Sequence, residues 1–262
     1  MGALILDPLA ALGRGAFAAC RTAGAVALFA LEALSHLFRP PFHWRMFARA
    51  FVEIAWFSLP VVALTAVFTG MVLALQSYTG FARFNAQSAI ASVVVISLTR
   101  ELGPVLAALM VAGRIGASFA AEIGTMRVTD QIDALTTLST NPMKYLVAPR
   151  LLAATIAMPL LVLVADILGV MGGWLIGIVK LNFVSAAYLK STFDFLQTED
   201  VVSGLVKAAV FGFIVALMGT WCGYNSRGGA QGVGGATTTA VVASSILILA
   251  FDYGLTEIFF GQ

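Results

Sequence analysis

Long apolar runs without charged residues, separated by short polar segments, dominate this chain of 262 residues. A helix that crosses a membrane needs about 20 consecutive apolar residues. Because the polar segments are too short for a soluble domain, the pattern predicts an all-α integral membrane protein, with one transmembrane domain over residues 51–262. The five predicted spans are 54–82, 84–113, 151–179, 208–226 and 228–251, the last with its helical part expected to start near Ala236.

The first 50 residues follow a different pattern. Residues 9–38 are apolar but interrupted, and their longest charge-free piece, 22–31, is too short to span. The interruptions are Arg14, Arg21, Glu32 and His36. We therefore predict an amphipathic helix over this segment that lies in the membrane interface and ends at "RPPF" (39–42). A sixth span, with Glu32 buried, is the alternative.

The distribution of Lys and Arg between the loops predicts the orientation. The N-terminal segment, the loop between spans 2 and 3 and the loop between spans 4 and 5 together hold ten basic residues, against four in the other two loops. Loops rich in Lys and Arg stay in the cytoplasm. The predicted topology is five spans with the N-terminus inside and the C-terminus outside.

Two of the loops carry helical patterns of their own. In the loop between spans 3 and 4, apolar residues recur near one face of a possible helix, which predicts a short interfacial helix on the outer side. These residues are Val184, Tyr188, Leu189, Phe193 and Leu196. The loop between spans 2 and 3 contains "EIGTMRVTDQIDAL" (122–135), and the helix expected within it is bracketed by Gly124 and Asn141-Pro142.

The segment 122–135 predicts a short amphipathic helix on the cytoplasmic side. Thr129 suits the N-cap and Asp130 suits the positive end of the helix dipole. Val128, Ile132 and Leu135 recur at helical spacing. This small apolar face either packs on its own bundle or inserts into a groove of a partner protein.

Small residues also recur at helical spacing within the spans. Such faces let helices approach closely, either inside one bundle or between two copies of a chain. The positions are Gly169, Gly173 and Gly177 in span 3, and Gly212, Ala216, Gly219 and Gly223 in span 4.

Composition narrows the function. The chain is 60% hydrophobic and 11% charged, and its net charge of +2 is too small to indicate nucleic-acid binding. Cys20 and Cys222 are isolated, so they predict neither a disulfide framework nor a metal site. No nucleophile–base arrangement indicates catalysis.

Three segments together resemble one known family: "FTGMVLALQ" (68–76), "LTRELGPVLAALMVAGRIGASFAAEIGTMRVTDQIDAL" (98–135) and "NPMKYLVAPR" (141–150). They are similar to the MlaE/YrbE family, the permease subunits of ABC transporters that work with MCE proteins on lipids. The similarity extends from "RPPFHWR" (39–45) to "FFG" (259–261). One departure is Asp130, where the family usually carries Glu, which keeps the charge.

The resemblance implies an assembly. It implies a permease homodimer bound to two ABC ATPase subunits, a hexameric ring of an MCE-domain protein on the periplasmic side, and often a STAS-domain protein on the ATPase. The implied cargo is phospholipid that moves between the inner and outer membranes and maintains outer-membrane lipid asymmetry. The implied location is the bacterial inner membrane, as a multi-pass protein. The N-terminal amphipathic helix matches the family's interfacial helix.

The resemblance also assigns the segment 122–136 to the family's coupling helix, which docks on the ATPase. The expected ATPase-coupling residues are Glu122, Gly124, Arg127, Asp130, Gln131, Asp133 and Leu135.

Nucleotide chemistry is expected in another chain. A P-loop needs a lysine after a glycine, but Lys144, Lys180, Lys190 and Lys207 follow Met, Val, Leu and Val. The glycine-rich "RGGAQGVGG" (227–235) lacks that lysine and predicts a flexible cytoplasmic turn. We therefore expect no cofactor and no enzymatic activity in this chain, with ATP and Mg²⁺ bound by the partner ATPase.

Arg100 and Glu101 interrupt the second span. A charge at this depth costs several kcal/mol unless it is paired or hydrated. Adjacent residues point about 100° apart on a helix, so each needs its own partner. Pro104 cannot bond the Arg100 carbonyl, which loosens the helix, and Gly103 adds freedom. The pair predicts either a structural network, for instance with Asp166, or a polar site in a central cavity.

The resemblance places the Arg100–Glu101 motif beside the lipid pocket of the dimer, where Arg100 would meet a lipid phosphate and Glu101 would shape or gate the site. The apolar candidates for the pocket, which an interfacial aromatic belt would also explain, are Leu73, Tyr78, Phe81 and Phe84. Two rival functions remain. One is a proton-coupled secondary transporter that uses Glu101 and Asp166, and the other is a membrane scaffold without a transport path.

Overall fold

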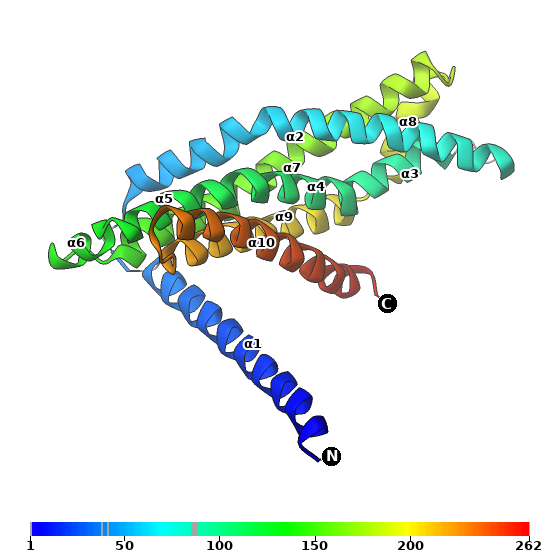
Figure 1. The fold of residues 1–262 in the computed structure, drawn as a ribbon. Helices are drawn as coiled ribbons and strands as arrows, with labels where there is room; N and C mark the ends of the chain where they lie inside the picture. The colour runs from blue at the N-terminus through cyan, green and yellow to red at the C-terminus, as the bar shows by residue number, and fades with distance from the viewer. Residues whose placement is uncertain (1, 38, 41, 85–88, 262) are drawn as a thin grey trace.

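Helices make up the whole regular structure of the described chain. A computed structural model describes residues 2–37, 39–40, 42–84 and 89–261, with the side chains of residues 2–12 and Phe84 left outside the description. Within these residues there is no strand. The all-α membrane prediction is therefore confirmed (Figure 1).

Five long helices carry most of the chain, and a helix with interruptions forms another span. The long ones are α1 (Gly2–Leu37), α2 (Trp44–Phe81), α7 (Ala148–Val179), α9 (Thr198–Tyr224) and α10 (Gly229–Phe260). The interrupted span comprises α3 (Ile90–Ser97), η3 (Leu98–Leu102), α4 (Gly103–Val111), η4 (Ala112–Gly116) and α5 (Ala117–Val128). The remaining elements are η1 (Ala82–Phe84), α6 (Gln131–Thr137), η5 (Met143–Val147) and α8 (Ser185–Phe195).

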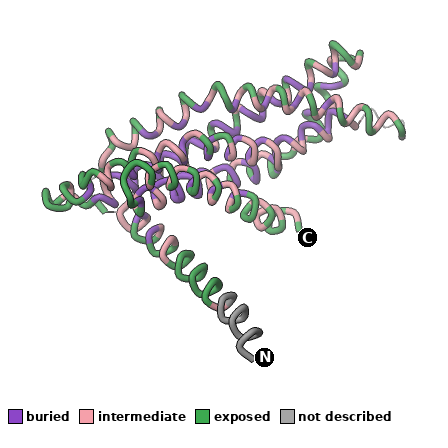
Figure 2. The backbone as a smooth tube through the Cα atoms, viewed as in Figure 1, coloured by how far each residue is buried: buried purple, intermediate pink, exposed green. Residues whose placement is uncertain are grey.

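Six helical stretches, not five, are long and apolar enough to cross a membrane. The additional one is Gly13–Leu37, within α1. α1 diverges steeply from the other helices, and most of its described surface is exposed (Figures 1 and 2). It is held near its C-terminal end, where Phe29 packs edge-on against Trp221 with ring centroids 5.2 Å apart. Both alternatives for this segment, interfacial or spanning, are compatible with these contacts.

The faces of small residues are filled by helices of the same chain. α2 packs along α7, where a Cβ on Gly172 would meet the backbone of Val67. A Cβ on Gly219 would lie 2.9 Å from the carbonyl oxygen of Gly116 on η4. Backbone approach of this kind is what glycine at helical spacing permits. Of the two alternatives for these faces, the structure shows packing inside one bundle.

The helices extend further than the charge-free runs predicted. α9 begins ten residues before the predicted span and includes Lys207, and α10 begins at Gly229 instead of near Ala236. The predicted flexible turn over 227–235 is therefore wrong beyond Gly228, whose φ of 87° makes the turn. The run predicted for α9 was too short because charged side chains that pair inside the bundle do not end a helix, whereas the start of α10 was placed too late because its first turns are rich in glycine. Arg114 and Arg150, counted as loop residues for the orientation, also lie in helices.

α6 and α8 lie at opposite ends of the bundle (Figure 1). The predicted helix in the loop between spans 3 and 4 is confirmed as α8, but its predicted apolar face is wrong. Tyr188 and Thr192 are buried, whereas Phe193 is 71% exposed. Phe193 lies about 140° round the helix from Tyr188, so one face cannot bury both. Burial raises the pKa of Tyr188 to about 12, so its hydroxyl is neutral at physiological pH.

Candidate functional site

The helix that carries Arg100 and Glu101 changes its hydrogen bonding at these residues. In the π-helical turn η3, the Gly103 N–H donates to the Leu98 carbonyl, five residues earlier. Pro104 has no N–H for the Arg100 carbonyl. The ammonium of Lys207, on α9, donates to that carbonyl instead at 3.1 Å. The loosening predicted from Gly103 and Pro104 thus takes the form of a π-turn, a feature common at functional sites.

Arg100 points toward the start of α9. Its Nε donates to Oδ1 of Asp200 at 2.6 Å, and its Nη2 lies 2.6 Å from the same oxygen. The other carboxylate oxygen of Asp200 accepts from the Gln197 N–H at 3.0 Å, as part of the cap of α9. The guanidinium also stacks 4.1 Å from the ring centroid of Phe260. Asp200 therefore fixes Arg100 and the first turn of α9 together.

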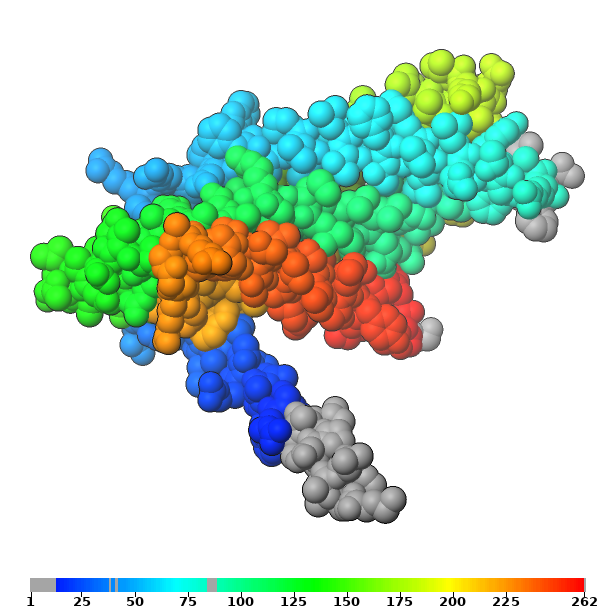
Figure 3. Space-filling model, viewed as in Figure 1, coloured from blue at the N-terminus to red at the C-terminus, as the bar shows by residue number. Residues whose placement is uncertain are grey.

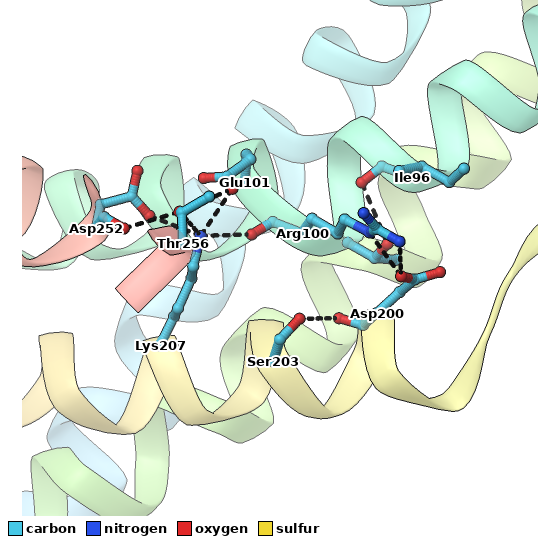
Figure 4. Close-up of polar contacts among 9 residues, drawn as sticks. Ile96, Arg100, Glu101, Asp200, Ser203, Lys207, Asp252 and Thr256 are labelled. Carbon is cyan, nitrogen blue, oxygen red and sulfur yellow. Dashed lines mark hydrogen bonds and ion pairs between the residues drawn. The ribbon is translucent and has the colours of Figure 1, made fainter. Parts of the chain in front are cut away.

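Glu101 points toward Lys207 and α10. Lys207 is fully buried, with its Nζ 2.8 Å from Oε1 of Glu101 and 3.0 Å from Oδ1 of Asp252 (Figure 4). It also donates to the Thr256 hydroxyl at 2.7 Å. An ammonium has three hydrogens, so it cannot donate to all four of its neighbours at once. Asp252 takes part through charge, because its Oδ1 makes no hydrogen bond within the described residues.

These contacts join three helices in one group, which we call the ion cluster: Arg100, Glu101, Asp200, Lys207, Asp252 and Thr256. It contains two cationic and three acidic side chains. The Lys207 and Asp200 side chains are 0% and 1% exposed, whereas those of Arg100 and Glu101 are 31% and 37% exposed. The ion cluster thus has a buried half that holds the helices and an accessible half that can meet a ligand.

The family model described as Permease MlaE matches residues 47–258.

The chain belongs to the MlaE permease family.

Relatives that match most of this chain carry the name of a permease or of a lipid. A probable ABC transporter permease protein of Rickettsia felis is 58% identical over 257 residues, covering 98% of this chain and 99% of the relative. A probable ABC transporter permease protein of Synechocystis is 43% identical over 78% of this chain and 77% of its own. The chloroplastic protein trigalactosyldiacylglycerol 1 of Arabidopsis thaliana is 34% identical over 90% of this chain and 67% of its own. This MlaE-family chain is an ABC transporter permease, a membrane subunit for transport.

The predicted network of Arg100 and Glu101 exists in this permease, but Asp166 is not part of it. Arg100 pairs with Asp200 and Glu101 with Lys207. Asp166 lies instead against Gly103, where a Cβ would collide with its Oδ1. The partners come from α9 and α10 because these helices, not α7, face the accessible side of η3.

The apolar residues predicted for the lipid path lie in a separate cluster. Leu73, Tyr78 and Phe81 pack around the buried Leu98 and its neighbours. Tyr78 meets Phe183 with ring centroids 6.0 Å apart. Phe84 lies outside the described side chains. Among the described side chains, Leu73, Tyr78 and Phe81 pack in this apolar cluster, whereas Arg100 pairs with Asp200 in the ion cluster.

The predicted coupling segment is divided between two helices. Glu122, Gly124 and Arg127 belong to α5, while Gln131, Asp133 and Leu135 belong to α6. The N-cap predicted at Thr129 is wrong, because the N-cap position of α6 is Asp130, in the left-handed region at φ 58° and without a side-chain cap hydrogen bond. Asp tolerates this conformation better than most residues. The chain therefore turns sharply at Asp130 instead of continuing from Thr129.

Contacts of the coupling segment separate its inner and outer faces. Arg127 bridges the turn to Asp133 at 2.7 Å, and Glu122 pairs with the buried Arg150 at 2.7 Å. Ile132 is 1% exposed, so the apolar face packs on its own bundle. Gln131 remains exposed at the end of the molecule, as does Asp133. A partner would therefore meet these polar side chains together with Leu138, which is 75% exposed at the end of α6.

Four members of the ion cluster were missed from the sequence. Lys207 and Asp200 were assigned to a loop, and Asp252 and Thr256 to the region after the last span. A signal was present: Asp200 and Lys207 are seven residues apart, two helical turns, and Asp252 and Thr256 are four apart. This spacing places each pair on one face, but it does not say that both faces turn toward Glu101.

Proposed function

We propose that this permease is the membrane subunit of an ABC transporter that moves phospholipids between the inner and outer membranes, driven by ATP hydrolysis in a partner ATPase. The observation that carries the proposal is the ion cluster, a partly accessible set of charges at a helix break inside a transport subunit. Charged groups at membrane depth mark substrate paths. The Arabidopsis relative is named after a lipid, trigalactosyldiacylglycerol, and this name supports a lipid cargo.

The accessible half of the ion cluster suits a lipid phosphate. Arginine binds phosphate through two parallel hydrogen bonds. A phosphate would compete with Asp200 for Arg100, because the ion cluster already holds three acidic side chains against two cationic ones. Glu101, held by Lys207 and Thr256, would limit how far the phosphate enters. The competition makes binding reversible, as transport requires.

The acyl chains of the cargo need an apolar surface next to the ion cluster. α10 lies across the face of the molecule seen in Figure 3, and it keeps Val242, Ile246 and Leu249 53%, 62% and 55% exposed. A second copy of the chain on this face would enclose a space with an apolar wall and two ion clusters. We propose the homodimer on this basis.

Movement of the coupling segment can reach the ion cluster through one helical path. The helical stretch Ile90–Val128 has no loop, so it connects η3 directly to the turn before α6. Its last 28 residues, from Glu101 onward, span about 40 Å. An ATPase bound at α6 would pull or rotate α5, and the π-turns η3 and η4 offer positions where the helix can shift. Binding and hydrolysis of ATP would then open and close the site around Arg100.

The remaining parts of the assembly rest on the family. They are an MCE-domain protein forming a hexameric ring on the periplasmic side, a STAS-domain protein on the ATPase, and residence in the bacterial inner membrane. Purification from the native membrane in mild detergent, with mass spectrometry of proteins and lipids, tests them together. Recovery of the chain without an ATPase, under conditions that preserve other ABC complexes, would refute the assembly.

Transport is tested with the purified complex in proteoliposomes that contain a fluorescent phospholipid. We expect ATP-dependent movement of the fluorescent phospholipid, and Arg100→Ala and Lys207→Met should abolish it. The control variant Lys190→Met, at an exposed site on α8, should retain it. Movement driven by a proton gradient without ATP would favour a secondary transporter. Unchanged movement in Arg100→Ala would remove the ion cluster from the path.

A further inference from the structure

A groove on the flank of the bundle lies apart from the ion cluster. It has a volume of about 430 Å³, lies between α3, η3, α7, α8 and the first turn of α9, and includes Val95, Asp166, Trp174 and Phe193 among its lining residues. Ile167, also in its wall, is 54% exposed, so the groove opens sideways. Its size is that of a pocket for a small molecule. Except for Asp166 and two hydroxyls, its lining side chains are apolar.

Asp166 forms a polar point in the wall of this groove. The residue is only 7% exposed, and its Oδ1 is covered beside Gly103 without a hydrogen-bond partner within the described chain. The two hydroxyls that line the groove are already engaged, since Thr99 donates to the Val95 carbonyl at 2.9 Å and Thr192 to the Tyr188 carbonyl at 3.0 Å. A buried carboxyl without a partner costs several kcal/mol. A donor that reaches the carboxyl from the groove would relieve this cost.

The depth of Asp166 is within reach of the polar part of a lipid. Asp166 touches Gly103, and Arg100, three residues earlier, pairs with Asp200 in the first turn of α9. Three residues of helix rise about 5 Å. α9 begins with the polar run Thr198, Glu199 and Asp200, which marks the level where the chain leaves the apolar layer. Asp166 thus lies about one helical turn below that level.

The shape of the groove favours an acyl chain over a transmembrane helix of a partner. A helix with its side chains is about 10–12 Å wide and packs closely where the opposing surface carries small residues. The lateral wall here consists of large side chains, such as Ile167, Met171 and Phe193, which leave a hollow instead of a flat seat. A flexible chain of methylene groups fills such a hollow.

We propose that this groove holds one lipid of the surrounding bilayer, with an acyl chain along Ile167 and Met171 and with a hydroxyl or ammonium donor of its polar part bonded to Asp166. This is a second lipid site, independent of the proposed path at the ion cluster. Thr99 lines the groove from the same η3 turn that carries Arg100 toward the ion cluster. A lipid in the groove supports the π-turn from the side opposite to the cargo.

The test uses the permease with its co-purified partners in nanodiscs of phosphatidylethanolamine and phosphatidylglycerol, with a trace of phosphatidylethanolamine that carries a diazirine in its acyl chain. After illumination, mass spectrometry locates the cross-linked residues. We expect cross-links concentrated on the groove segments of α7 and α8. Ile167→Trp, which fills the hollow, should reduce them about tenfold. Leu175→Trp, at a 44% exposed position on α7 outside the groove lining, should not.

The polar contact has its own variants. Asp166→Leu removes the acceptor and should lower retention of phosphatidylethanolamine during detergent washing about tenfold, as expected for one charged hydrogen bond. Asp166→Asn keeps an acceptor oxygen and should retain most of it. Ile167→Trp remains informative if Asp166→Leu does not fold, because the position is at the surface.

Three results would overturn the proposal. One is equal cross-linking in Ile167→Trp and Leu175→Trp, and another is an even spread over all lipid-facing helices. The third is a groove signal from the chain alone that disappears in the complex, which would assign the groove to a partner helix. Lys207→Met separates this proposal from the proposed function, because it should abolish transport and leave the groove signal intact.

Discussion

Replacing Lys207 by Met tests the central role of the buried half of the ion cluster. Met has nearly the same length and no charge, so the change leaves the volume and removes the ammonium. The wild-type ammonium lies 2.8 Å from Glu101, 3.0 Å from Asp252 and 3.1 Å from the Arg100 carbonyl. After the substitution, two neighbouring carboxylates lose their shared cation and a carbonyl at a π-turn loses its donor.

The expected loss of stability follows from these contacts. Removing one partner of a buried ion pair costs about 3–5 kcal/mol. Glu101 is 37% and Asp252 19% exposed, so water screens part of their repulsion and the lower end applies, about 3 kcal/mol. For a chain of this size, 1 kcal/mol corresponds to about 2–4 °C in Tm. We therefore expect a decrease in Tm of about 6–12 °C.

Thermal unfolding in mild detergent, followed by intrinsic fluorescence, measures this change. The matched variant combines Lys207→Met with Glu101→Gln and Asp252→Asn, which removes the uncompensated charges as well. Neutral groups of similar shape can replace a buried ion pair with little loss. The triple variant should regain most of the Tm but not transport. A Tm of Lys207→Met equal to wild type, or a triple variant less stable than the single one, would refute the reasoning.

Three further predictions use the same unfolding measurement. Asp200→Ala should lower the free energy of unfolding by about 2–3 kcal/mol, because the cap of α9 and the ion-pair partner of Arg100 are lost together. Asp200→Asn should lower it less, and equal losses would contradict the role of Asp200 in both contacts. Gly172→Ala should lower the free energy of unfolding by about 1–3 kcal/mol, because the added Cβ would meet the backbone of α2. Gly113→Ala has open space around the added Cβ and should leave the free energy of unfolding unchanged. Similar values for both variants would show that α2 and α7 adjust freely. Glu122→Gln should lower the free energy of unfolding by about 2 kcal/mol, because the 7% exposed side chain of Arg150 loses its carboxylate partner. An unchanged Tm would show that this pair contributes nothing to stability.

Sequence patterns alone predicted the helical class and the spans but misplaced their ends. A charge was taken to end a span, and this rule held at Arg83 but failed at Lys207 and Arg150. The difference is pairing: Lys207 meets Glu101 from another helix, and Arg150 meets Glu122. Partners that are 106 residues away, as for Lys207, or 28 residues away, as for Arg150, leave no local signal. The polar break at Arg100 was predictable, because Pro104 and adjacent charges act within one helical turn.

The sequence by itself determined the membrane class of this permease, the interruption at Gly103–Pro104, the helices in two loops and, through its motifs, the family. These features depend on local properties: the length of apolar runs, the missing N–H of proline and the spacing of small residues. Only the tertiary structure decided that Arg100 pairs with Asp200, that Glu101 shares Lys207 with Asp252, and that Asp166 lies alone in a groove. Such contacts depend on how each helix is rotated against its neighbours. That rotation is fixed by the packing of all the helices together, since no single helix carries both members of a pair.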